Sequence, residues 1–305
     1  MTLYKKLNTV LKEKYGRRVQ RLSISLGLGC PNRDGTTGTG GCIFCDPTGS
    51  GFAAMSPEHS VEEQILSLRE KMMRKYRSPL FFIAYFQSFS NTYAPIPVLK
   101  SFYDRILPFR DIVALDVSTR PDLVCDEVLE LLASYRDERE VFLELGLQSV
   151  NTETLRILNR GHTLEEWIDG AERAKQKGLS VIAHMILDLP WDSEQDIVAA
   201  AQTLNRVGIS GVKCHSLYVV AGTVLAKMVE TGDVRLLPPE AYIQRLILFL
   251  EHLNPEIVIH RLVSDAPKTG VLQKVDRPKS LLIREIEEEM AKRDTWQGKR
   301  CRAIL

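Results

Sequence analysis

The stretch "CPNRDGTTGTGGCIFCD", residues 30–46, sets three cysteines in a C-x11-C-x2-C pattern, at Cys30, Cys42 and Cys45. The strand-like run "RLSISLGLG", residues 21–29, leads directly into this stretch. Cysteine thiolates are ligands for soft metals such as zinc and iron in iron–sulfur clusters. The sequence therefore predicts a metal-binding loop that follows a strand.

Two kinds of metal site are compatible with this loop. A structural zinc site is closed and four-coordinate, so His59 or Asp46 would have to supply its fourth ligand. A [4Fe–4S] cluster held by three cysteines accounts better for the count, because it leaves the fourth iron open for another ligand. The glycines between residues 35 and 41 allow the loop to wrap such a cluster through backbone angles that other residues avoid.

The composition is that of an ordinary globular chain of 305 residues, with 44% hydrophobic and 26% charged residues. No apolar run reaches the roughly 18 residues that cross a bilayer. The N-terminus lacks the apolar region of a signal peptide, so we expect a cytoplasmic protein with no membrane partner. The net charge is +1, but basic residues gather in residues 1–21, 69–77 and 299–302. These segments predict either a phosphate-binding face or solvated helix surfaces.

Apolar runs alternate with amphipathic segments along most of the chain. Strand-like runs occupy residues 22–28, 80–86, 111–117, 141–147, 179–187 and 211–219. Helix-like segments lie near residues 60–76, 96–107, 123–135, 151–177, 193–206 and 239–253. This alternation is typical of βαβ units around a parallel sheet. We therefore predict an α/β fold, a partial (β/α)6 TIM-like barrel, with an open doubly wound sheet as the alternative.

A seventh strand-like run follows at residues 255–264, and an amphipathic helix ends the chain at residues 280–294. We expect one catalytic domain over residues 21–265, between a basic N-terminal extension, residues 1–20, and a C-terminal extension with one helix, residues 266–305. In parallel barrels the functional loops leave the carboxyl ends of the strands. The cysteine loop occupies such a position.

The cysteine loop and three further motifs resemble the radical S-adenosylmethionine (SAM) superfamily. The motifs are "ELGLQSVNTETLRILNRGHT", residues 144–163, "HMILDLPWDSEQD", residues 184–196, and "SLYVVAGTVL", residues 216–225. They are similar to segments shared by the elongator catalytic subunit and oxygen-independent coproporphyrinogen oxidase. The spacing departs from the common C-x3-C-x2-C pattern, but longer first gaps occur in the elongator branch.

The resemblance implies a radical SAM fold in which Cys30, Cys42 and Cys45 hold a [4Fe–4S] cluster that binds SAM. It implies a reducing electron donor such as flavodoxin or ferredoxin. Small bacterial proteins of this branch are associated with the wobble uridine of tRNA, so the implied reaction converts 5-carboxymethylaminomethyluridine to 5-aminomethyluridine. The alternatives are a radical SAM enzyme acting on a small molecule, or a zinc-stapled module that binds nucleic acid. Because the chain is shorter than the elongator subunit, we do not expect acetyl transfer.

Polar residues at the predicted strand ends are candidates for binding SAM or substrate. They are Gln87, Ser88, Ser118, Arg120, Glu144 and Gln148. A glutamate buried within "VFLELGL" needs a partner; SAM or substrate is one candidate, and an ion pair with Arg156 or Arg160 is the alternative. His184 and Arg261 are candidate catalytic residues, and Arg261 has a fork of donors suited to a substrate carboxylate.

Overall fold

The computed structural model describes residues 2–49, 52, 54–78, 80–267, 269–275 and 277–301. Arg302, one of the predicted basic residues, lies outside these ranges. Within them, seven parallel strands form one sheet in the order β1-β2-β3-β4-β5-β6-β8. The strands are β1 (Val19–Ile24), β2 (Phe81–Phe86), β3 (Ile112–Thr119), β4 (Glu140–Gln148), β5 (Ser180–Ile186), β6 (Gly211–His215) and β8 (Val258–Arg261).

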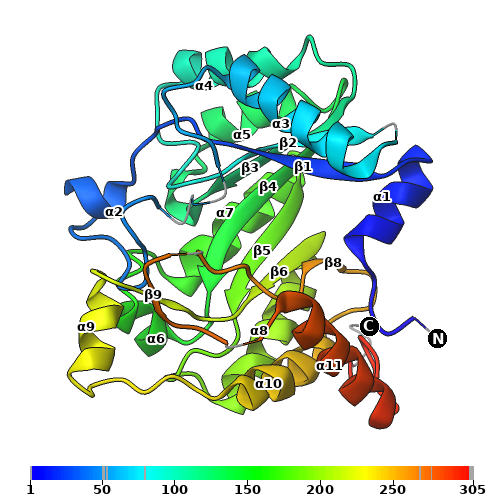
Figure 1. Ribbon diagram of the computed structural model, residues 1–305. Coiled ribbons are helices and arrows are strands. Elements are labelled where there is room, and N and C mark those ends of the chain that lie inside the picture. Colours follow the sequence, from blue (N-terminus) through cyan, green and yellow to red (C-terminus); the bar gives the residue numbers. More distant parts are fainter. Residues whose placement is uncertain are drawn as a thin grey trace.

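The sequential strand order decides between the two predicted folds. Parallel crossovers are right-handed, so an order without reversal places every crossover helix on the same face of the sheet. The sheet curls into a half-barrel with these helices outside (Figure 1), and the prediction of a partial barrel is confirmed. The longer helices are α3 (Val61–Tyr76), α4 (Ile96–Tyr103), α5 (Asp126–Ala133), α7 (Leu164–Gln176), α8 (Glu194–Val207), α10 (Pro239–His252) and α11 (Lys279–Lys292).

The first strand ends earlier than the sequence predicts. The expected strand covers residues 22–28, whereas β1 ends at Ile24. The side chain of Gln64 in α3 binds both backbone groups of Ser25, with its Oε1 accepting from Ser25 N and its Nε2 donating to Ser25 O, each at 2.9 Å. The chain therefore leaves the sheet at Ser25 and reaches Cys30 as a loop.

Two predicted elements are each divided in the structure. The helix expected at residues 151–177 is split into α6 (Thr152–Ile157) and α7, because Asn159 and Gly161 adopt positive φ angles of 52° and 65°. The strand expected at residues 211–219 is split into β6 and the short β7 (Val219–Val220). This strand pairs with β9 (Val271–Gln273) in a separate antiparallel ribbon. The short helices α2 (Pro31–Asp34) and α9 (Val224–Glu230) were not predicted.

The N-terminal segment closes the amino-terminal end of the half-barrel. Helix α1 (Leu7–Tyr15) lies at the right of Figure 1, opposite α2, α6 and α9. Its Leu7 and Leu11 pack on the inner face of the sheet against residues that include Ile83 and Phe142. Lys6 forms an isolated parallel bridge with Ile259 of β8. The N-terminal segment therefore contacts the last strand of the sheet before α1 leads into β1, the first strand. None of the described helices is long and apolar enough to span a membrane.

Candidate active site

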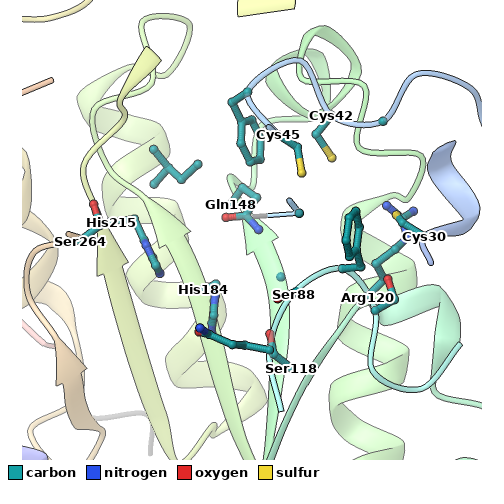
Figure 2. Close-up of a pocket in the computed structure, with 18 of the residues that line it drawn as sticks. Cys30, Cys42, Cys45, Ser88, Ser118, Arg120, Gln148, His184, His215 and Ser264 are labelled. Carbon is teal, nitrogen blue, oxygen red and sulfur yellow. The ribbon is translucent and has the colours of Figure 1, made fainter. Parts of the chain in front are cut away.

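A cavity of about 250 Å³ opens at the carboxyl ends of the strands. All three cysteines of the predicted metal loop line it. Figure 2 shows the cysteines on one side, His184, His215 and Ser264 on the other, and Gln148 between them. The fold thus brings the predicted metal loop and several predicted polar residues to one cavity, at the end of the barrel where function was expected.

The cysteine loop is held by the junction between α6 and α7. The backbone N–H of Ile43 donates to Leu158 O at 3.1 Å, and Asn159 Nδ2 donates to Gly41 O at 2.8 Å. Arg160 Nη1 donates to the sulfur of Cys42 at 3.1 Å. Hydrogen bonds of this kind to a sulfur stabilise the thiolate form and tune a bound cluster. The motif at residues 144–163 therefore positions the metal loop.

The chemistry of the thiols fits a multi-iron cluster better than a single ion. Burial raises the pKa of Cys45 to about 11; Cys42 adds to this rise and Arg33 opposes it. Such a thiol stays protonated at neutral pH unless a metal binds its thiolate. Among the described residues, no three His, Cys, Asp or Glu side chains converge on a position for one ion. A four-iron cluster binds each cysteine at a different corner, so its ligands need not converge.

The two residues proposed as a fourth zinc ligand are not placed for that role. His59 is exposed and is not among the residues that line the cavity. Asp46 Oδ1 accepts hydrogen bonds from the backbone N–H and the hydroxyl of Thr48, both at 2.6 Å. Neither side chain completes a closed four-coordinate site with the cysteines, so the structure does not support the zinc alternative.

The cavity wall presents buried polar atoms that have no hydrogen-bond partner within the described chain. These atoms are Gln87 Nε2, Ser90 Oγ, Arg120 Nη1 and His215 Nε2. Buried polar groups are normally paired, so their presence around one cavity indicates a polar ligand. SAM, with its amino, carboxylate and ribose hydroxyl groups, fits this wall.

Five of the six predicted binding residues line the cavity. These are Gln87, Ser88, Ser118, Arg120 and Gln148. Ser88 and the following Phe89 have φ angles of 80° and 52°, a left-handed conformation that is uncommon for residues other than glycine and clusters at functional sites. Arg120 is anchored by Asp122, with Nε to Oδ1 at 2.9 Å, and by Gly161 O, while its Nη1 stays unpaired.

Glu144 is the exception, because it does not line the cavity. Its side chain is fully buried one layer below. There its Oε2 accepts from Lys213 Nζ and lies 2.7 Å from His184 Nε2. The alternative partners, Arg156 and Arg160, are engaged elsewhere, Arg156 with Glu153 on the surface and Arg160 with the cysteine loop. Glu144 therefore neither lines the cavity as a ligand for SAM or substrate nor pairs with Arg156 or Arg160. Its partners are Lys213 and His184 in a buried network.

The other members of this network were not predicted from the sequence. Arg21 Nε donates to Asp116 at 3.2 Å, and Arg21 Nη2 lies 3.6 Å from Glu144 Oε1. Lys213 is fully buried, with its Nζ 4.0 Å from the centre of the Tyr85 ring. Arg21 lies in the mixed strand β1, whereas Asp116 and Lys213 are charged residues within largely apolar runs. The reasoning applied to Glu144, that a buried charge needs a partner, would have identified them.

Burial and mutual contact shift the pKa values of these groups. Burial raises the pKa of Asp116 to about 8, and the charge of Glu144 adds to the rise. Burial lowers the pKa of Lys213, with a further contribution from Arg21, while the carboxylates of Glu144 and Asp116 oppose this and favour its charged form. Although burial alone raises the pKa of Glu144, Lys213 and His184 hold it well below its usual value. Glu144 is therefore the carboxylate that remains charged in the network.

Four arginines make the cavity wall electropositive. They are Arg33, Arg120, Arg160 and Arg261, whereas Asp265 is the lining carboxylate and pairs with Lys279. Three of these arginines donate to protein groups. Within the described residues, Arg261 is the cavity arginine with neither a hydrogen bond nor an ion pair. The cavity therefore favours an anionic group, and Arg261 is free to receive it.

Comparison with known proteins identifies the family. The model of the radical SAM superfamily matches residues 24–204, and the radical SAM C-terminal domain matches residues 209–292. The chain belongs to the radical SAM superfamily. As a radical SAM protein it is an enzyme, and its cofactors are a [4Fe–4S] cluster and SAM. The roles of individual residues in holding these groups stay predictions.

The relatives place this radical SAM enzyme near the elongator branch. The YtqA protein of Bacillus subtilis is 32% identical over 299 residues, which are 97% of this chain and 92% of that protein. Elongator complex protein 3 of Schizosaccharomyces pombe is 31% identical over 158 residues, 51% of this chain and 28% of that protein. The structure of Elp3 from the archaeon Methanocaldococcus infernus has a similar fold, with a TM-score of 0.71 and 18% identity. The match covers 92% of this chain and 64% of the archaeal chain.

Proposed function

We propose that this radical SAM enzyme acts on the wobble uridine of tRNA and converts its 5-carboxymethylaminomethyl group to an aminomethyl group. The observation that carries the proposal is the electropositive cavity, in which the predicted cluster ligands face an unpaired arginine. The substrate's carboxymethyl group supplies the anion that such a wall favours. The similarity to elongator proteins supports an RNA substrate. A tRNA substrate also agrees with the predicted cytoplasmic location.

In this proposal the three cysteines hold the cluster, and polar residues beside the cysteine loop hold SAM. Gln87 and Ser88 follow β2, line the cavity and would bind the amino group of SAM. Ser118, Arg120 and Gln148, which also line the cavity, would bind its ribose or carboxylate. When bound, the cluster supplies the electron that splits SAM and yields the radical that removes a substrate hydrogen. The role of the protein is to position the reacting groups and to exclude water.

The carboxymethyl carbon is the expected site of hydrogen abstraction. It lies between a nitrogen and a carboxylate, so the resulting carbon radical is stabilised by both neighbours. The carbon must then point toward the SAM side of the cavity while the carboxylate points away from the cysteines. His184 lies on the side that this orientation requires (Figure 2), and Arg261 ends β8, the edge strand next to β6, which carries His215. We assign the catalytic unit to residues 21–265, as the sequence predicts.

The test is an anaerobic assay with cluster-loaded enzyme, SAM, a strong reductant such as dithionite, and an anticodon stem-loop RNA carrying the carboxymethylaminomethyl group. We expect 5′-deoxyadenosine and 5-aminomethyluridine, both measured by mass spectrometry. Cys42→Ser should abolish both products, whereas Cys125→Ser, an exposed cysteine outside the cavity, should not. SAM cleavage without any change to the RNA, in the assay and in the tRNA of a deletion strain, would assign the chemistry to a small-molecule substrate instead.

A further inference from the structure

The wall opposite the cysteines joins an unpaired arginine to a histidine that a buried carboxylate orients. We propose that this wall is a subsite for an N-carboxymethyl amine, in which Arg261 binds the carboxylate and His184 removes the proton of the secondary amine. In this proposal, Glu144 and Lys213 position His184. The inference rests on the function proposed above and adds the residues that recognise the substrate and prepare it for hydrogen abstraction.

The tautomer of His184 follows from its contact with Glu144. Glu144 is an ionised carboxylate that can only accept, so the Nε2 atom of His184, 2.7 Å away, carries the proton. The neutral ring then has its lone pair on Nδ1. His184 lines the cavity, and 15% of its side-chain surface remains exposed. Nδ1 has no hydrogen-bond partner within the described chain, so it is available to a ligand.

Lys213 keeps this arrangement in place. Its ammonium donates to the same Glu144 oxygen that accepts from His184. The side chains of Lys213 and Glu144 are both completely buried, so no bulk water competes with Lys213 and His184 for the carboxylate. A histidine held in one tautomer by a buried carboxylate is a recurrent form of general base, because the carboxylate also stabilises the imidazolium that forms.

The adjacent strands bring Arg261 and His184 to the same wall. The register pairs His184 with Lys213 and Lys213 with Arg261, so the two residues lie two strand spacings apart, about 10 Å at the backbone. Long side chains that point into a curved sheet converge from such positions. His215 lies between them, its ring centre 5.1 Å from that of His184.

The charges around His184 favour a substrate with a neutral amine and an ionised carboxylate. Other titratable or charged groups face it from β1, β2, β3, β4, β6 and β8. They are Arg21, Tyr85, Asp116, Glu144, Lys213, His215, His260 and Arg261. Arg261 on β8 lines the cavity and repels an ammonium group, whereas Lys213 on β6 is buried below with Glu144. Burial and these two cations lower the pKa of His184, and the contact with Glu144 opposes them. The same cations attract a carboxylate.

Removal of this proton serves the proposed reaction directly. A secondary amine is largely protonated in neutral water, and an ammonium nitrogen has no lone pair to share with a neighbouring radical carbon. In the step we propose, the N–H bond of the ammonium breaks and a new N–H bond forms at Nδ1 of His184, giving a neutral amine and an imidazolium. No electron is transferred, and no further reactant is needed. Hydrogen abstraction from the adjacent carbon then yields a radical that the nitrogen stabilises.

The carboxylate half of the proposal is tested by binding, without turnover. Cluster-loaded enzyme with SAM and no reductant is titrated with two stem-loop RNAs, one bearing the carboxymethylaminomethyl group and one bearing the aminomethyl group. We expect the wild type to prefer the first by about ten-fold or more. Arg261→Gln should reduce this preference to about two-fold without weakening the binding of the second RNA. The control Arg284→Gln, on the exposed face of α11, should behave as wild type. An Arg261→Gln enzyme that keeps the full preference would overturn this assignment.

The histidine half is tested by the protonation state of its ring. In enzyme labelled with 15N-histidine, His184 should be protonated only at Nε2 when free, and at both nitrogens when the carboxymethylaminomethyl RNA is bound. In His184→Gln and Glu144→Gln, the rate of 5′-deoxyadenosine formation should fall about ten-fold for each unit by which pH is lowered below the pKa of the substrate's secondary amine. The wild type and the control His252→Gln, in α10, should show no such slope. A ring that stays neutral on binding would show that His184 is not the base.

The outcomes separate this inference from the proposed function. If the wild type neither prefers the carboxymethylaminomethyl RNA nor converts it, the proposed function and the subsite are both wrong. If the wild type converts that RNA but the Arg261 and His184 variants match their controls, the function stands and the subsite is wrong. The double variant Lys213→Met/Glu144→Gln removes both buried charges together, so a failure of His184→Gln or Glu144→Gln to fold leaves the base assignment testable.

Discussion

Lys213 shows how one buried residue links stability to the site. It is fully buried in β6, pairs with Glu144 and lies over the ring of Tyr85. A buried ion pair contributes little net stability compared with apolar side chains, but loss of one partner leaves the other charge unpaired in the interior. The network below the cavity therefore depends on both charges being present together.

Replacement of Lys213 by methionine should destabilise the protein strongly. The remaining Glu144 carboxylate would be buried without its main partner, which costs about 3–5 kcal/mol and lowers the thermal midpoint by about 5–8 °C for a chain of this length. Anaerobic differential scanning fluorimetry of the cluster-loaded protein measures this shift. Lys227→Met, on the exposed face of α9, should change little. The double variant Lys213→Met/Glu144→Gln should recover much of the loss, and equal midpoints for the single and double variants would contradict the charge argument.

Asp188 should make the stability of the protein depend on pH. Burial raises its pKa to about 7, although Leu217 N donates to its Oδ1 at 2.7 Å. The folded state therefore holds a proton between about pH 4 and 7 that the unfolded state has lost, so stability falls as pH rises through this range. Asp188→Asn keeps the acceptor without the charge and should be more stable than wild type at pH 8 by up to about 4 kcal/mol.

Thermal midpoints of wild type and Asp188→Asn, measured between pH 5 and 8, check this expectation. Part of the difference is already present at pH 5; the two curves should diverge further up to about pH 7 and run parallel above it. Asp137→Asn, an exposed aspartate, provides the matched control and should follow the wild type throughout. Parallel curves for Asp188→Asn and wild type would mean that Asp188 is ionised across the range.

Among the elements, the junction between α6 and α7 connects the sheet to the metal loop. Asn159 and Arg160 lie in this junction and bind Gly41 O and Cys42 Sγ. The positive φ of Asn159 and Gly161 ends one helix and turns the chain back before the next. The segment that the sequence predicts as one long helix thus contains a turn whose side chains point into the loop.

Arg160 should tune the reduction potential of the cluster. Its guanidinium donates to the sulfur of Cys42, and such a donor stabilises the more negative, reduced form. Arg160→Met should shift the midpoint to a more negative potential, by roughly tens of millivolts within the range that such contacts set. Arg160→Lys, which keeps the charge, should shift it less. Redox titration followed by electron paramagnetic resonance gives the midpoint, and Arg156→Met, whose arginine pairs with Glu153 on the surface, is the control.

The sequence predicts the repeating elements well because most strands lie in largely apolar runs that helices cover on one side. It predicts the metal-binding role of the cysteine loop because three cysteines grouped on one loop are typical of metal binding. It does not predict the β7–β9 ribbon, because strands of two and three residues leave no periodic pattern. Nor does it predict the contact between Glu144 and Lys213, which lie 69 residues apart and meet only when the sheet curls. Long-range pairing of charges is a property of the folded sheet.

At the scale of the whole molecule, the basic segments and the cavity lie at opposite ends of the barrel. Lys14, Arg17 and Arg18 lie just before β1, and the cavity lies past its carboxyl end. Arg18 stacks on Tyr76, at the end of α3, and Lys75 contacts the same ring. The first two basic segments therefore meet on one surface. A tRNA is long enough to place its anticodon in the cavity and still reach along the side of the barrel.

This arrangement gives the last prediction, for the variant Lys14→Ala/Arg17→Ala/Arg18→Ala. If these residues bind the phosphate backbone, binding of full-length tRNA should weaken, and the slope of log affinity against log salt should fall by about 0.7–0.9 for each phosphate that is no longer neutralised. Binding of the short stem-loop, which does not extend to the far end, should stay the same. An equal reduction of charge elsewhere, Arg206→Ala/Arg284→Ala/Lys292→Ala on exposed faces of α8 and α11, controls for net charge. If both triple variants reduce the slope equally, the effect is one of overall charge; if neither does, the basic surface is ordinary solvated surface and tRNA is held at the cavity end alone.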